Sequence, residues 1–313
     1  MSLLARMAAQ GRWLLIGGLA AGILLPDLAA WMAPAIVPFL AVMLCIAALR
    51  EGPRAALPGR ADAPRALAVA LVLQCALPLS VGAALWAAGL LSAPLATGAV
   101  LALAAAPITG TPGLAVMSGA DAGAALRQLT LGTALLPLTA APVFALLPVF
   151  PDPWAVAAGA LRLLAIVALA AGIAVALRAR FPALRRPEAR PSLDGIMALA
   201  MAIVVIGLMS AVGPAATEAP GRLLLAFAVA AGLYLVQTLG AWHAARAAIP
   251  RPEALAVTIA AGNRNLALFL AAVPAETAAP LMVFVGCYQI PMYLTPLLLP
   301  KLTSRSSARG RGA

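Results

Sequence analysis

Near the end of the chain an apolar stretch is interrupted by Ala260-Ala261-Gly262-Asn263-Arg264-Asn265, in which an arginine stands between two asparagines. The stretch covers residues 254–273, so Arg264 falls near the middle of a bilayer at a helical rise of ~1.5 Å per residue. A guanidinium there costs on the order of 2.5–3.5 kcal/mol, and such residues usually face the bundle interior and mark a substrate or ion pathway. The alternative is structural, because Arg264 could hold a broken helix together by donating to freed backbone carbonyls.

The composition identifies the class of protein. Apolar residues make up 64% of the 313 positions and charged residues only 10%, which excludes a water-soluble globular domain and a nucleic-acid-binding protein. The net charge of +11 comes from basic residues in short connections between apolar runs, a pattern that reports membrane orientation. The three cysteines lie in apolar runs without CxxC pairing, so we expect no disulfide, metal site or metal cofactor at Cys45, Cys75 or Cys287.

Ten apolar stretches are each broadly long enough to cross a core about 30 Å thick, although the first is marginal. Their continuous Ala/Leu/Val composition lacks the period-two alternation of barrel strands. The sequence therefore predicts an all-α polytopic membrane protein with ten transmembrane helices. We name them spans one to ten: 13–26, 33–49, 65–90, 94–119, 123–148, 154–178, 193–213, 221–245, 254–273 and 277–300.

The positive charges fall almost entirely on one side of this ten-span arrangement. Only Arg222 lies on the opposite side, while Arg162 and Arg264 lie within spans. Basic connections stay in the cytoplasm, so we expect both termini to be cytoplasmic, in a bacterial-type inner membrane. The cytoplasmic set is Arg6, Arg12, Arg50, Arg54, Arg60, Arg65, Arg127, Arg178, Arg180, Arg185, Arg186, Arg190, Arg246, Arg251, Lys301, Arg305, Arg309 and Arg311.

An internal repeat divides the ten spans into two halves. Spans five and ten share Gly132/Gly286, Pro137/Pro291 and Pro142/Pro296, and Gln74 in span three has its counterpart at Gln237 in span eight. Five spans per half is an odd number, which forces the second repeat into inverted topology. We therefore expect spans one to six within residues 1–178, the second repeat at 154–302 and a basic cytoplasmic tail at 303–313.

Two spans in corresponding places of the halves carry helix-breaking sequences. Span four contains Pro107, Gly110, Pro112 and Gly113, which predict a discontinuous helix because proline removes a donor and clashes with the preceding turn. Span nine contains Gly262, directly before Asn263-Arg264-Asn265. Paired broken helices in inverted repeats point to a transport site near the midplane, where helices four and nine cross.

The polar side chains around these breaks are the candidate site. We expect substrate-binding groups among Arg264, Asn263, Asn265, Gln74, Thr109 and Thr111, and possible ion ligands among Thr130, Thr133 and Gln237. For the span-five threonines Thr130 and Thr133, a hydroxyl bonded back to its own helix is at least as good an interpretation. Buried amides such as Gln74 and Gln237 require partners.

These features resemble the bile acid/sodium symporter family and its superfamily of bile acid, arsenite and riboflavin transporters. The resemblance covers essentially the whole chain and is carried by Leu73-Gln74 with Pro78, by Pro107 through Met117 and by Thr258 through Ala267. It implies an alternating-access transporter in which a panel of spans one, two, six and seven moves against a core of the other six. The substrate class that it implies is a small organic anion.

Several positions depart from the family pattern. The sodium-binding glutamate of the family falls at Ala260, the glutamine that follows it at Arg264, and a Ser-Asn pair at Pro112-Gly113, while Gln74 and Asn265 remain. A guanidinium gained where a carboxylate is lost suggests that a fixed cation replaces a bound one, which argues against sodium coupling. Span four lacks a cysteine for arsenite capture, which argues against the exporter branch.

The expected function is therefore secondary transport of a small organic anion, without a cofactor and with sodium or proton coupling left open. One alternative is a transport-inactive membrane sensor or scaffold with a locked core, and another is a sodium-coupled symporter that uses the remaining neutral ligands. Enzyme activity is not expected, because the only histidine, His243, lacks a nucleophile or acid partner. We expect no nucleic-acid partner. The sequence does not indicate an oligomeric state.

Overall fold

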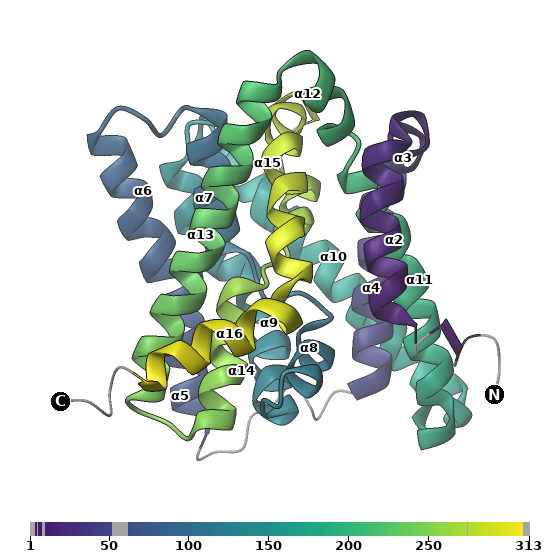
Figure 1. Cartoon of the computed structure of the whole chain (residues 1–313). Coiled ribbons are helices and arrows are strands. Elements are labelled where there is room, and N and C mark those ends of the chain that lie inside the picture. The colour runs from purple at the N-terminus through teal and green to yellow at the C-terminus, as the bar shows by residue number, and fades with distance from the viewer. Residues whose placement is uncertain (1–3, 5, 8–9, 52–61, 274, 309–313) are drawn as a thin grey trace.

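The computed structural model describes residue 4 and residues 6–7, 10–51, 62–273 and 275–308, and this part of the chain is helical without a β-strand (Figure 1). The α-helices are α2 (Gly11–Leu24), α3 (Pro26–Met32), α4 (Ile36–Glu51), α5 (Ala63–Leu71), α6 (Leu77–Ala87), α7 (Pro94–Ala104), α8 (Thr111–Met117), α9 (Ala122–Leu146), α10 (Pro153–Arg180), α11 (Arg190–Leu208), α12 (Val212–Glu218), α13 (Pro220–Arg246), α14 (Arg251–Gly262), α15 (Ala275–Tyr293) and α16 (Thr295–Ala308). Short 3-10 or π segments are η1 (Ala33–Ala35), η2 (Val72–Ala76), η3 (Pro182–Arg185), η4 (Pro187–Ala189) and η5 (Leu266–Ala271).

Several of these helices are long and apolar enough to cross a membrane, so the chain is a multi-pass all-α membrane protein. Among the described residues six helices meet this criterion, and a bent pair at Ala278–Tyr293 and Thr295–Thr303 makes a seventh if it counts as one span. Two further apolar helices, Trp13–Leu24 and Pro94–Ala104, are shorter. The six are Pro26–Arg50, Ala63–Ala87, Ala122–Leu146, Pro153–Arg180, Pro187–Glu218 and Pro220–Arg246.

Local sequence explains where the longest helices begin. The carboxylate of Asp121 accepts hydrogen bonds from the backbone N–H groups of Gly123 and Ala124, and so caps α9. Asp152 caps α10 in the same way through the N–H of Ala155. Such caps satisfy the free donors of a first helical turn, and they keep the carboxylates at helix ends and away from the middle of the bundle.

The helices pack in two groups. One group consists of α2, α3, α4, α10 and α11, which contact one another and lie together on one side of Figure 1; we call it the panel. The other consists of α5 to α9 and α13 to α15, and we call it the core group. The groups meet where α10 contacts α9 and where α4 contacts η5.

Exposed tryptophans lie near the ends of the apolar helices. Trp31, Trp86 and Trp154 are 77%, 68% and 80% exposed, and each lies near the end of the bundle where α6 ends and α10 begins. Trp13 is 59% exposed and lies at the start of α2, at the opposite end. Tryptophan is enriched at both membrane–water interfaces, so this distribution fits a membrane-spanning bundle.

The structure differs from the sequence-based expectation at the C-terminal end. Span ten is divided by a bend of 62° between α15 and α16, and Figure 1 shows α16 lying across the lower end of the bundle. Residues 303–308, which we expected in a basic tail, continue α16, and 309–313 lie outside the described residues. Pro291 and Pro296 flank the bend, consistent with the loss of helical hydrogen bonds that proline causes.

The glycines that suggested the repeat lie in different surroundings. A side chain at Gly132 would come within 2.6 Å of Gln74 and 2.9 Å of Pro107, both in the core group. A side chain at Gly286 would instead approach Val212 and the carbonyl of Leu208 beside the panel. The shared spacing therefore does not reflect a shared packing role.

Candidate functional site

Two helices are interrupted, and their interrupted segments pair with each other. The chain leaves helical geometry after Ala104 and resumes it at Thr111, and it leaves it again after Gly262. The N–H of Ile108 donates to the carbonyl of Asn263 at 2.9 Å, and the N–H of Asn265 donates to the carbonyl of Ala106 at 2.7 Å. These two bonds form an antiparallel bridge between Pro107 and Arg264. Backbone groups freed by the breaks thus satisfy one another inside the protein, as an apolar environment requires.

The expected break residues divide into two sets. Pro107 and Gly110 lie in the non-helical segment, and Gly262 is the last residue of α14. The expectation was wrong for Pro112 and Gly113, which lie in the first turn of α8. Proline is tolerated there because the first N–H groups of a helix have no intrahelical acceptor to lose.

Arg264 is completely buried, and its guanidinium donates to backbone carbonyls. Its Nη2 lies 2.7 Å from the carbonyl oxygen of Leu73 and 2.7 Å from that of Leu103. Its Nη1 makes a longer contact of 3.5 Å with the carbonyl of Ala260. Its Nε is buried without a hydrogen-bond partner. The contacts therefore fit the structural alternative, in which Arg264 holds interrupted helices together.

Two prolines explain why these carbonyls are free. In an α-helix the carbonyl of Leu103 would accept from residue 107, but Pro107 has no N–H. At Leu73 the helix is a π segment, in which the N–H of Leu77 donates five residues back to Val72. The donor in the same register for Leu73 would be Pro78, which again has none. One guanidinium thus satisfies two carbonyls that prolines have left without donors.

No carboxylate balances the charge of Arg264 among the described residues. The ion pairs there join Arg50 to Asp194 at 3.0 Å, and Arg65 to both Asp62 and Glu253. All of these lie at the ends of helices. The hydrogen-bond partners of the Arg264 guanidinium are therefore backbone carbonyls, and no described carboxylate forms an ion pair with it.

A second set of side chains satisfies the end of α14. The hydroxyl of Tyr288 donates to the carbonyl of Gly262 at 2.9 Å, as Arg264 donates to Leu103 at the end of α7. Gln237 donates through Nε2 to the hydroxyl of Tyr288 at 3.2 Å, and its Oε1 is buried without a partner. Gln237 therefore supports the end of α14 through Tyr288.

Asn263 belongs to the same internal network. Its Nδ2 donates to the carbonyl of Ile259 at 2.9 Å, and its Oδ1 accepts from the hydroxyl of Thr295 at 2.9 Å. The hydroxyls of Thr295 and Tyr234 lie 2.7 Å apart. Both the nitrogen and the oxygen of the Asn263 amide are thus hydrogen-bonded within the protein. The side chain stabilises the end of α14 and does not line the pocket described next.

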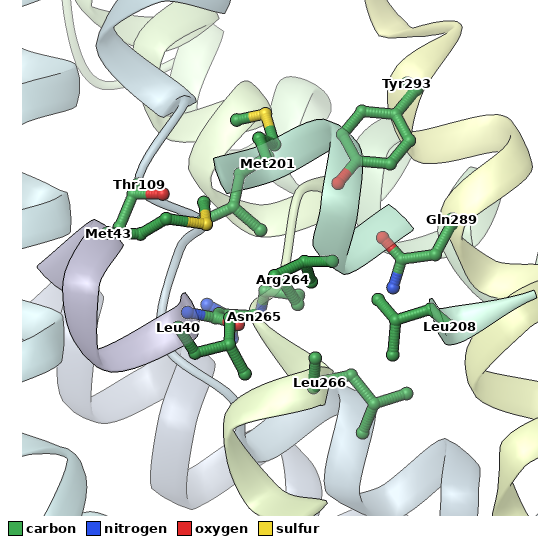
Figure 2. Close-up of a pocket in the computed structure, with 13 residues that line it drawn as sticks. Leu40, Met43, Thr109, Met201, Leu208, Arg264, Asn265, Leu266, Gln289 and Tyr293 are labelled. Carbon is green, nitrogen blue, oxygen red and sulfur yellow. The ribbon is translucent and has the colours of Figure 1, made fainter. Parts of the chain in front are cut away.

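A small pocket lies where the panel meets the interrupted helices. Its polar side chains Thr109, Asn265, Gln289 and Tyr293 are neutral, and Arg264 also lines it. The hydroxyl of Thr109 is buried without a partner. The space holds about one water molecule, so the pocket is too small for an organic solute in this structure. The apolar residues around it are Leu40, Met43, Ile108, Met201, Val204, Leu208, Leu266 and Ala267, and Figure 2 shows ten of the lining residues labelled around the space.

The structure separates the expected site residues. Arg264, Asn265 and Thr109 meet at the pocket, whereas Asn263 does not. The hydroxyl of Thr111 donates to the carbonyl of Ile108 at 2.6 Å and is used locally.

Three further candidates on spans three and five are not in the pocket. Gln74 accepts from Thr139 at 3.3 Å. Thr130 bonds back to Leu126 at 3.0 Å on its own helix, and Thr133 is half-buried on α9.

Sequence reasoning missed the contribution of α15 and of the panel to the pocket. Gln289 is 2% exposed, and a lone amide in an apolar stretch is the signal that had singled out Gln74 and Gln237. Met43 and Met201 carry no comparable signal, because methionine is an ordinary residue in an apolar helix. Their place in the site depends on how the panel packs against the core group.

The arrangement can hold a small solute with hydrogen-bonding groups next to a fixed positive charge. It has no nucleophile–base pair, and no cluster of metal-binding side chains occurs within the described ranges. No model of a known protein family matches this chain, and no curated protein matches it.

Proposed function

We propose that this protein is a secondary transporter of a small organic anion that works by alternating access. In this proposal the chain has ten spans in two inverted five-helix repeats, with spans four and nine broken, and it is similar to the bile acid/sodium symporters. The single observation that carries the proposal is the pocket at Arg264, which lies between the panel and two interrupted, paired helices. Substrate sites of transporters typically lie at such breaks.

The fixed charge of Arg264 supports an anionic substrate. The lining side chains other than Arg264 are neutral, so a bound anion would be the only negative charge near the guanidinium. Thr109 and Asn265 offer a hydroxyl and an amide for orientation. A buried, unpartnered donor costs about 1–3 kcal/mol, and an anion that accepts from Thr109 would relieve that cost.

The same geometry supports transport without sodium. Carbonyl oxygens are typical ligands of a hard cation, but those of Leu73 and Leu103 are already bonded to Arg264. The methyl group of Ala260 stands where the resemblance implies a sodium-binding glutamate. We therefore assign to Arg264 the role of a cation that is permanently attached to the chain.

The locations of the Arg264 partners favour a transporter over a locked scaffold. Leu73, Leu103 and Ala260 all belong to the core group, so the guanidinium does not join the core group to the panel. Motion between the two groups would leave these bonds intact. For orientation we propose a bacterial-type inner membrane with both termini in the cytoplasm, on the side that carries most of the basic residues, and no enzyme activity.

Uptake by proteoliposomes tests this function. The purified protein is reconstituted and supplied with labelled p-aminohippurate, pyruvate or taurocholate, with the cation tetraethylammonium as a control for charge. We expect saturable, protein-dependent uptake of at least one anion, changed less than about twofold when choline replaces sodium.

Two results would contradict the proposal in different ways. Binding of an anion without any exchange across the membrane would favour the sensor, whereas uptake that requires sodium would show that the neutral ligands still hold an ion.

A further inference from the structure

We infer that transport is uncoupled from any cation, and that the membrane potential therefore drives the anion out of the cell. This inference rests on the proposed transport function and adds its driving force and direction. It follows from which charges can move in one cycle, and those that the chain contributes can be identified in the structure.

The first step concerns cations that could accompany the substrate. The guanidinium of Arg264 takes the carbonyls of Leu73 and Leu103, each at 2.7 Å, and it cannot dissociate from the chain. A dissociable sodium ion that used these carbonyls as ligands would have to displace the guanidinium from both. The charge of Arg264 therefore crosses with the core group in both directions of every cycle, so it contributes no net charge movement.

The second step concerns protons. Among the described residues that line the pocket, none is Asp, Glu, His or Lys. Arginine keeps its proton in proteins, amides and threonine hydroxyls do not titrate, and the phenol of Tyr293, which also lines the pocket, keeps its proton at neutral pH. His243 is exposed near the end of α13, away from the pocket. The site thus has no group that would pick up a proton on one side and release it on the other.

The charge balance of a cycle then follows for a substrate with one negative charge. The loaded core group carries that charge together with the +1 of Arg264, so the site is electrically neutral as it moves. The empty core group returns with +1 alone. The potential therefore acts on the empty return step, and one negative charge is moved per cycle.

The direction follows from the sign of the potential. A negative cell interior draws the empty, positively charged core group toward its cytoplasm-facing position, where it loads substrate from inside. For one elementary charge, 100 mV corresponds to an outward concentration ratio of about 50-fold at equilibrium. An uncoupled carrier of this kind is an exporter of organic anions.

Comparison of net flux with exchange tests the inference. The membrane potential of the proteoliposomes is set with valinomycin and potassium gradients. The probe is labelled p-aminohippurate, or whichever monoanion of the uptake experiment is transported fastest. Net flux includes the empty return step, so we expect a change of tenfold or more over 100 mV. Exchange, with the same anion on both sides, uses only the neutral loaded step and should change less than about twofold.

Variants at Arg264 and Arg222 sharpen the test. In Arg264→Gln the loaded core group carries the anion's charge alone, so exchange should become sensitive to the potential. Arg222→Gln, at an exposed arginine in the first turn of α13, should behave as the wild type.

The outcomes distinguish this inference from the proposed function. Three wild-type results would overturn the inference without contradicting the proposed transport function. These are net flux that does not change with the membrane potential, exchange that changes as much as net flux does, and accumulation driven by a sodium or proton gradient at zero potential. These wild-type results decide the matter even if Arg264→Gln does not fold. No protein-dependent flux of any anion in either mode would overturn the proposed function as well.

Discussion

Arg264→Ala is expected to weaken anion binding about 100-fold and to destabilise the protein. Opposite charges about 6 Å apart attract by about 3 kcal/mol at an effective dielectric constant of about 20, and this attraction is lost with the guanidinium. The carbonyls of Leu73 and Leu103 also lose their donor, at about 1–3 kcal/mol each, because prolines leave them no alternative. Calorimetric titration with p-aminohippurate and thermal unfolding in detergent measure the two effects.

Arg162→Ala is the matched control. Arg162 is an arginine on an apolar helix too, but it makes only a 3.4 Å contact with the carbonyl of Ala272 and does not line the pocket. We expect its removal to change affinity less than threefold and to lower the unfolding midpoint by a few degrees at most. Equal affinity of wild type and Arg264→Ala would contradict a role for the guanidinium in anion binding.

The two asparagines beside Arg264 are expected to have separable effects. Asn265→Ala removes an amide that lines the pocket, and hydrogen bonds to charged groups contribute about 1.5–3 kcal/mol, so we expect affinity to fall about 10- to 100-fold. Asn263→Ala removes an amide that bonds Thr295 and Ile259, so we expect lower thermal stability with affinity nearly unchanged. Binding and unfolding measurements on both variants check the pair, and the reverse assignment would show that the pocket is misidentified.

The sequence predicts the membrane class and the two interruptions for simple physical reasons. A chain with so few charges cannot fold in water, and Pro107 with Gly110 cannot continue a helix. The end of the first break was misplaced because Pro112 can either break a helix or begin one, and only tertiary structure distinguishes the two.

The composition of the site was harder to predict. Asn263 and Asn265 are chemically identical and two residues apart, and the backbone torsions of the break determine which one reaches the pocket: φ −103° and ψ 84° at Asn263 and φ −82° and ψ 60° at Asn265. The contributions of Met43, Met201 and Gln289 depend on contacts between distant helices. By contrast, the partners of Arg264 had a signal in Pro78 and Pro107, each of which leaves one carbonyl without a donor.

The most direct test of the central claim is a sodium titration of thermal unfolding, performed on the wild type and on Ala260→Glu/Arg264→Gln. If Arg264 stands in place of a bound cation, sodium at constant ionic strength leaves the wild-type midpoint unchanged. The double variant has a carboxylate and free carbonyls, and sodium at about 100 times its dissociation constant should stabilise it by about 2.7 kcal/mol. Sodium-specific stabilisation of the wild type would contradict the account, because it would mean that an ion still binds beside the guanidinium.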